Sequence, residues 1–220
     1  MTATASEVES QFREFVLDPR FPCLAGKGVV NGRGYRIGTY GVLGSRRSAA
    51  RLARDLERFL EEERDESRTM RAYAAVFTAT PRCNELEFEQ RLWEQLVRVD
   101  AAAGAGHPWA PGTSADPDDP AFSFSVAGRA LFVIGLHRDS SRLARQFRWP
   151  TLIFNPHEQF DRLRESQKFD TLKGHVRERE IALQGSLNPN LADFGARSEA
   201  RQYSGRHTEE EWQCPFHRRS

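Results

Sequence analysis

The stretch PTLIFNPHEQFDRLRE, residues 150–165, decides the fold, because it begins as an apolar strand and continues as a helix. His157 lies at the changeover. Upstream, RALFVIGLHRDSS (129–141) contains a second apolar run that ends at His137. Nearly continuous apolar runs of this length are typical of strands covered on both faces. The two segments therefore predict two central strands of a sheet, each followed by a histidine.

Further strands and helices alternate around these two segments. The segment AFSFSVAGRALFVIGLH (121–137) predicts a hairpin whose turn falls at Ala127-Gly128. Other strands are expected at 34–44 and 70–80, and helices at 6–17, 45–68, 84–103, 140–148 and from His157 onward. The segments without periodicity are predicted to be loops: 18–28, 104–120 and a tail from Ser186 that lies on the surface.

This alternation predicts an α/β fold, with a single mixed β-sheet, helices packed on its faces and a loop-rich C-terminal tail. No linker divides the chain, so residues 1–220 are expected to form one domain. The helix expected at 140–148 would make the strands of the 130s and 150s parallel neighbours. Their C-terminal ends would then meet at one edge of the sheet, where ligands usually bind in open α/β sheets. We therefore expect His137 and His157 to line one pocket.

The bulk composition excludes several classes of protein. The 32 basic and 31 acidic residues give a net charge of +1, so neither nucleic acid nor a membrane surface is an expected partner. No apolar stretch of about 18 residues is present, and no signal peptide is expected at the N-terminus. The three widely spaced cysteines favour a reducing cytoplasm. CxxC, HExxH, GxGxxG and P-loop spacings are all absent, so any redox partner is expected to be a separate protein.

A few residues have types and positions that suggest chemistry. His137 and His157 are candidate metal or haem ligands, because a neutral imidazole beside a pocket commonly has that role. Cys23 is either a thiolate ligand or a small buried side chain. Arg142 and Arg145, three residues apart on the expected helix, would either bind carboxylates or face solvent.

The residues also resemble a known family. The matching segments are FPC (21–23), FSFSVAGRALFVIGLH (122–137), SSRLARQFRWPTLIFNPHEQFDRLR (140–164), REREIALQGSLNPNLADFGARSEARQYSGR (177–206) and CPF (214–216). They are similar to the YqcI/YcgG family, most densely from Ala121 to Arg206. One departure is Arg138 in GLHRDSS, where relatives are expected to carry proline. Characterised members are haem-dependent N-oxygenases of natural-product pathways, which hydroxylate side-chain nitrogens of arginine-like amino acids or oxidise amines. The arginine hydroxylase of D-cycloserine biosynthesis resembles them in activity.

The resemblance implies a cytoplasmic monooxygenase that uses haem b, O2 and a separate electron donor to convert L-arginine to N-omega-hydroxy-L-arginine. The alternatives are N-oxidation of a primary amine, a non-catalytic haem sensor or carrier, and a metal-free binding module.

Named residues acquire roles under this interpretation. His157 is the expected axial ligand because Pro156 and the start of a helix restrain it. His137 is the alternative ligand, and Cys23 is the third candidate. Arg142 and Arg145 would hold the haem propionates. Asp193 or Glu199 would bind the guanidinium group of the substrate.

Overall fold

The computed structural model describes residues 3–62, 70–104, 108–165, 169–192 and 195–217. The centre of the protein is a five-stranded mixed sheet with the strand order β1-β2-β5-β4-β3, as the α/β prediction requires. The strands are β1 (Tyr35–Tyr40), β2 (Ala72–Phe77), β3 (Phe124–Val126), β4 (Arg129–Leu136) and β5 (Thr151–Pro156).

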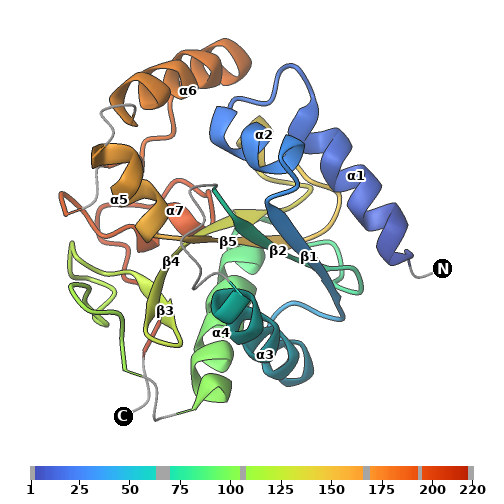
Figure 1. Ribbon diagram of the computed structural model, residues 1–220, viewed down its shortest axis with the longest axis vertical. Helices are drawn as coiled ribbons and strands as arrows, with labels where there is room; N and C mark the ends of the chain where they lie inside the picture. Colours follow the sequence, from blue (N-terminus) through green and yellow to red (C-terminus); the bar gives the residue numbers. More distant parts are fainter. Residues whose placement is uncertain (1–2, 63–69, 105–107, 166–168, 193–194, 218–220) are drawn as a thin grey trace.

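Helices cover both faces of this sheet (Figure 1). The helical elements are α1 (Ala5–Leu17), α2 (Leu24–Asn31), α3 (Arg46–Glu62), α4 (Glu85–Ala103), the 3-10 turn η1 (Leu143–Arg145), α5 (Glu158–Glu165), α6 (Phe169–Gln184) and α7 (Ala200–Tyr203). The end of the helix expected over 45–68 lies outside the described residues from position 63.

Two apolar cores hold the layers together. Leu52, Leu56, Phe88 and Trp93 of α3 and α4 are buried in one core against one face of the sheet. The other core joins α1 and α2 to the opposite face (Figure 1). The helices present apolar side chains at helical spacing, so burying that side of each helix removes it from water. The prediction of helices packed on the faces of one sheet is confirmed.

The expected parallel pairing of the two histidine-bearing strands is wrong. β1 and β2 are parallel, whereas β4 and β5 are antiparallel neighbours. In their register Leu131 lies opposite Pro156, and Leu136 lies opposite Thr151. The segment between the strands contains one short 3-10 turn, which returns the chain to the same edge of the sheet. His137 and His157 therefore follow opposite ends of the strand pair.

Two loop predictions are also wrong. Residues 24–31 form α2, although the sequence is rich in glycine. The helix forms because Cys23 caps it and because Val29 and Val30 are buried in the second core. The C-terminal tail is not confined to the surface either. Tyr203 and Phe216 are fully buried in the first core. Tyr203 reaches the core from the four-residue helix α7, and Phe216 from a segment without regular structure, so neither belongs to a longer apolar pattern.

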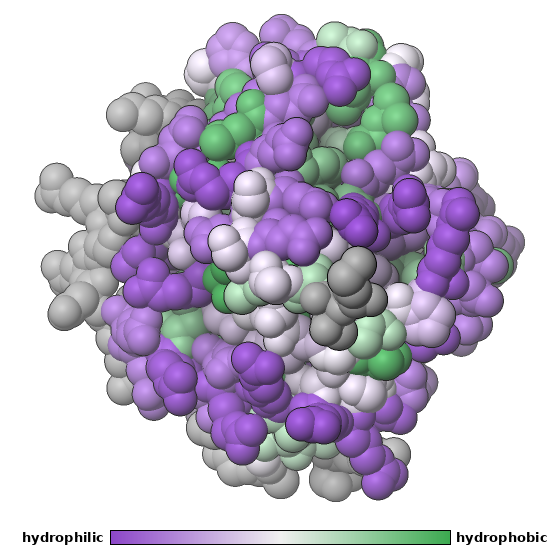
Figure 2. All heavy atoms as spheres, turned by 90° about the vertical axis from the view of Figure 1, so that its right-hand side faces the viewer, coloured by the Kyte–Doolittle hydropathy of each residue, from purple (hydrophilic) through white to green (hydrophobic). Residues whose placement is uncertain are grey.

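The hairpin prediction is confirmed. Ala127 and Gly128 both have positive φ values, 52° and 73°, as a two-residue turn that matches the twist of the flanking strands requires. The face of the molecule shown in Figure 2 is mostly hydrophilic, with apolar residues in small separate areas. Within the described ranges, no helix is both long enough and apolar enough to cross a membrane.

Candidate functional site

A pocket of about 450 Å³ opens beside the end of β5. It combines an aromatic wall, charged side chains of both signs and one histidine. Its lining residues are Phe132, His157, Phe160, Arg164, Phe169, Asp170, Lys173, Ala192, Glu199 and Gln202. They come from β4, from the β5–α5 junction, from α6 and from the C-terminal tail. The volume is within the range of small-molecule sites.

His157 is held rigidly where β5 passes into α5. Its backbone N–H donates to the carbonyl of Ala130 at 2.9 Å, and its carbonyl accepts from the N–H of Phe160 at 2.8 Å. The rings of Phe132 and Phe160 approach the imidazole edge-on, at centroid distances of 6.4 and 6.2 Å. The residue is 8% exposed. A strand end and a helix start thus fix the imidazole against an aromatic wall.

Glu199 lies at the base of the pocket and contacts three side chains. Its Oε2 is 2.9 Å from Nε2 of His157. Its Oε1 accepts hydrogen bonds from Oγ of Ser123 at 3.0 Å and from the hydroxyl of Tyr203 at 2.5 Å. Burial and the neighbouring Glu199 carboxyl raise the pKa of Tyr203 well above its usual value, so the phenol stays protonated. Because Glu199 is only 3% exposed, this cluster is shielded from bulk water.

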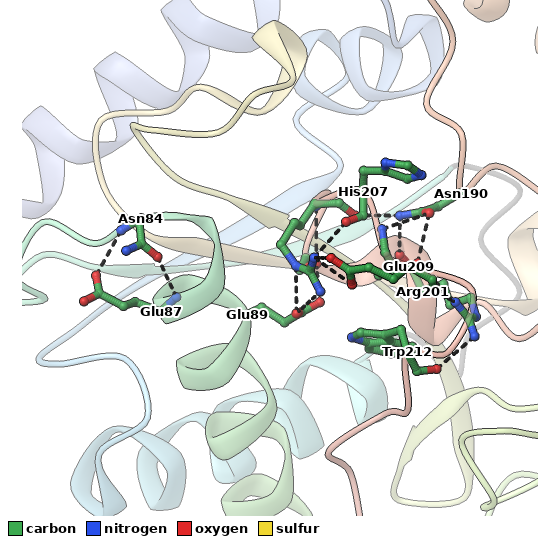
Figure 3. Close-up of polar contacts among 11 residues, drawn as sticks. Asn84, Glu87, Glu89, Asn190, Arg201, His207, Glu209 and Trp212 are labelled. Carbon is green, nitrogen blue, oxygen red and sulfur yellow. Dashed lines mark hydrogen bonds and ion pairs between the residues drawn. The ribbon is translucent and has the colours of Figure 1, made fainter.

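Hydrogen bonds and ion pairs hold the tail that carries Glu199 in place (Figure 3). Arg206 bonds the buried carboxyl of Glu89 on α4 through Nε at 3.0 Å and Nη2 at 2.9 Å. The side-chain amide of Asn190 donates to the carbonyls of Arg201 and Arg206 at 2.9 and 2.6 Å. Paired in this way, buried polar groups stabilise one arrangement of a segment that lacks regular structure. These contacts hold the described part of the tail on both sides of Glu199.

Cationic side chains line the pocket from α5 and α6. Arg164 extends over the ring of Phe169 at 5.0 Å and pairs with Asp161 at 2.6 Å. Lys173 and Asp170 come from one side of α6, three residues apart. The pocket can therefore bind an apolar ring system that carries carboxylates at its edge.

The sequence profile of the YqcI/YcgG family matches residues 12–217. The chain belongs to the YqcI/YcgG family. The match includes every residue of the pocket. No curated protein and no solved structure is significantly similar to this sequence. Neither of these two comparisons indicates what this YqcI/YcgG protein binds.

The structure brings together two of the residues that the sequence singled out, His157 and Glu199. Phe160 and Arg164, at spacings of three and seven residues after His157, were missed although helical periodicity places them on its side of α5. No spacing or motif in the sequence indicated that Gln202 lines the pocket or that Tyr203 bonds Glu199. Asp193, the other expected substrate contact, lies outside the described residues.

His137 does not line this pocket in the YqcI/YcgG protein. It is 1% exposed and stacks on Phe88 of α4, with ring centroids 4.3 Å apart. Neither of its ring nitrogens has a hydrogen-bond partner among the described residues. Burial lowers its pKa, against opposing contributions from Glu85 and Asp139. Its surroundings are those of a core side chain.

The buried His137 predicts a loss of stability in mild acid. Its pKa in the folded protein lies below the 6.5 of a free imidazole, so the unfolded chain binds a proton more readily. The contribution of neutral His137 to the free energy of unfolding is fully present above about pH 6.5. It falls as the pH drops toward the pKa of His137 in the folded protein. Urea unfolding of the wild type should show a steeper loss between about pH 7 and pH 5 than unfolding of His137→Phe. Parallel pH profiles would contradict the prediction.

The side chains of Arg142 and Arg145 form hydrogen bonds and an ion pair within the protein. Arg142 pairs with Glu180 of α6 at 2.5 Å and donates to the carbonyl of Ser186 at 2.7 Å. Arg145 donates to the carbonyl of Tyr203 at 3.0 Å. Burial lowers the pKa of Arg145 to about 10, which still leaves it charged at neutral pH. Neither residue lines the pocket. Their contacts attach the η1 turn to α6 and α7.

Cys23 is the side-chain cap of α2. Its sulfur accepts a hydrogen bond from the N–H of Gly26 at 3.3 Å. Burial raises the pKa of the thiol, which opposes thiolate formation. Cys23 is not among the residues that line the pocket.

Proposed function

We propose that the protein holds haem b in the His157 pocket and hydroxylates a side-chain nitrogen of an arginine-like amino acid, with L-arginine as substrate and N-omega-hydroxy-L-arginine as product. The observation that carries this proposal is the buried His157–Glu199 pair at the base of an aromatic pocket with cationic side chains. Haem requires an axial ligand, an apolar slot and partners for its propionates. His157, the aromatic wall and the cationic side chains of the pocket would meet these three requirements, and the activity is the one implied by the family resemblance.

The His157–Glu199 contact fits axial ligation. Metal-binding histidines usually direct one ring nitrogen to a carboxylate, which orients the ring and makes the other nitrogen more basic. Nε2 of His157 faces Glu199, so Nδ1 is the nitrogen that would hold the haem iron. Glu199 is therefore a positioning residue in this proposal and not the group that binds the substrate. Haem when bound supplies the activation of O2 and the transfer of one oxygen atom to an N–H bond.

The remaining side chains of the pocket would orient cofactor and substrate. Phe132, Phe160 and Phe169 would cover the faces of the ring and exclude water. Arg164 and Lys173 would pair with the propionates. Asp170, the exposed carboxyl among the lining residues, would bind a guanidinium group.

The test is a spectrum followed by a turnover assay. Protein produced with a haem precursor should show a Soret band, and its ferrous–CO complex should have the spectrum of histidine ligation. With a reductant and 18O2, L-arginine should yield a product that carries one labelled oxygen on the guanidino group. Absence of haem would contradict the whole proposal. Haem without labelled product from L-arginine would contradict its catalytic part, and an oxidised primary amine would change the substrate class.

A prediction for the propionate partners follows from the cationic residues. Arg164→Ala and Lys173→Ala should each weaken haem binding, because a charged hydrogen bond contributes about 1.5–3 kcal/mol. Arg164 is partly exposed, so we expect the lower end of that range, or about a tenfold rise in the haem dissociation constant. Arg142→Ala is the matched control, since it removes an arginine whose partners lie outside the pocket. Soret titration measures all three variants. Weaker binding in Arg142→Ala alone would restore Arg142 as the propionate ligand.

A further inference from the structure

A line of oxidisable aromatic side chains runs from the base of the pocket toward the surface. Tyr203 of α7 bonds Glu199, and its ring stacks on Trp93 of α4 with centroids 5.5 Å apart and an interplanar angle of 20°. Trp93 in turn lies 6.3 Å from the ring of Trp212 in the tail. Tyr203 and Trp93 are 0% and 1% exposed, whereas Trp212 is partly exposed. We call these three residues the aromatic relay.

We propose that the aromatic relay carries single electrons from the surface at Trp212 to an oxidant in the His157 pocket. Tyrosine and tryptophan are the side chains of lowest oxidation potential after cysteine, and ring contact favours electron exchange between them. The physiological role rests on the proposed function: the relay would discharge an oxidising equivalent left at the haem when no substrate consumes it.

The first step couples the electron to a proton. Tyr203 loses one electron to the pocket oxidant, and its phenolic proton moves to Oε1 of Glu199, which already accepts its hydrogen bond at 2.5 Å. A buried phenol is difficult to oxidise unless the proton has an acceptor within contact. The Glu199 carboxyl supplies that acceptor.

The next steps return the proton and pass the electron deficiency outward. Trp93 gives an electron to the tyrosyl radical, and the proton returns from Glu199 to Tyr203. The indole nitrogen of Trp93 is buried without a hydrogen-bond partner among the described residues. An oxidised Trp93 therefore keeps its proton and readily takes an electron from Trp212.

The last step takes place at Trp212. The guanidinium carbon of Arg201 lies 5.2 Å from the Trp212 ring, and Arg201 also donates to the Trp212 carbonyl at 2.9 Å (Figure 3). A cation over the ring disfavours a second positive charge, so oxidised Trp212 releases its indole proton to solvent. A soluble reductant such as ascorbate then restores the electron, and water restores the proton. The net change is one electron moved from the reductant to the pocket oxidant.

The test uses a tethered photo-oxidant and needs no haem. In a Cys23→Ser, Lys173→Cys form of the full chain, a thiol-reactive tris(bipyridyl)ruthenium complex is attached at the pocket, with Cys83 and Cys214 protected by burial. Serine keeps the cap of α2. After flash excitation with a soluble electron acceptor, transient absorption should show a tyrosyl radical followed by a tryptophan radical. Trp212→Phe should remove the long-lived tryptophan signal.

Two variants interrupt the aromatic relay at different points. Tyr203→Phe keeps the stacked ring but removes the oxidisable phenol, so most of the tryptophan radical should be lost. Trp93→Phe should leave the tyrosyl radical in place and remove the Trp212 signal. Trp149→Phe is the matched control, because Trp149 lies in the second core, and it should not change the signal. Circular dichroism checks folding.

An unchanged Trp212 radical in both Tyr203→Phe and Trp93→Phe would overturn the proposal. Because the photo-oxidant replaces haem, this result is independent of whether the protein is an N-oxygenase. An intact relay in a protein that binds no haem would contradict the proposed function but not the electron path.

Discussion

Replacing His157 with alanine should abolish the Soret band of the purified protein while the far-UV circular dichroism spectrum stays that of the wild type. The substitution removes the one imidazole among the described residues that line the pocket, and the aromatic wall cannot ligate iron. Added imidazole should restore part of the band, because the deleted ring leaves a space of its own shape beside Glu199. Rescue by imidazole separates loss of a ligand from misfolding.

The matched control for this prediction is His137→Phe. It removes both nitrogens of the other strand-end histidine and keeps a ring stacked on Phe88. We expect this variant to retain haem. The reverse pattern, with haem lost in His137→Phe and kept in His157→Ala, would move the ligand to the opposite end of the strand pair.

Glu199→Gln extends the same prediction to the positioning residue. The amide keeps the shape of the side chain but removes the negative charge beside the imidazole and accepts more weakly from Tyr203. Loss of the group behind a metal-binding histidine typically reduces metal affinity by about 10–100-fold. Haem affinity in Glu199→Gln should therefore fall by that factor but not vanish. An unchanged affinity would show that Glu199 does not orient the ligand.

Gly135→Ala should strongly destabilise the protein. Gly135 lies in β4, paired with Leu152 in the centre of the sheet. An added Cβ would lie 2.7 Å from Cε1 of Phe88 and 2.8 Å from the carbonyl oxygen of Tyr203. Both neighbours are fixed, one by α4 and the other by its hydrogen bond to Arg145. We expect a loss of about 3 kcal/mol. That corresponds to a fall in Tm of roughly 6–12 °C in calorimetry.

Gly28→Ala is the matched control for the same change of one methyl group. Gly28 lies inside α2, and an added Cβ would meet nothing within 4 Å. Alanine is favoured over glycine inside a helix by about 0.8–1.0 kcal/mol, so this variant should be slightly more stable than the wild type. If both variants lost stability equally, the cause would be backbone conformation and not crowding at β4.

Local pattern was enough to predict much of the fold. The apolar runs that end at His137 and His157 are the strands β4 and β5, and the Ala127-Gly128 turn joins β3 to β4 as predicted. The α/β class and the mixed sheet follow from the same alternation of elements. These features depend on residues within one turn or strand of each other, where the spacing of apolar side chains directly determines which face is buried. There are two exceptions. The glycines of α2 hide a helix, and the helix expected over 140–148 is wrong, because only the 3-10 turn Leu143–Arg145 forms there.

Only the tertiary structure decided the direction of β5 relative to β4. A connection of this length can join parallel or antiparallel strands, so local pattern does not distinguish the two. The antiparallel pairing separates His137 from His157 and leaves one histidine beside the pocket.

The tertiary structure likewise decided the roles of the charged residues and of the tail. Arg142 and Arg145 have the chemistry of anion-binding groups, but Glu180 and backbone carbonyls already bind them. Glu199 and Tyr203 meet His157 and Trp93 across long stretches of sequence. The sequence by itself determined the strands, most of the helices and His157 at a strand end. Which distant side chains surround that histidine depends on packing between segments, and local periodicity carries no information about it.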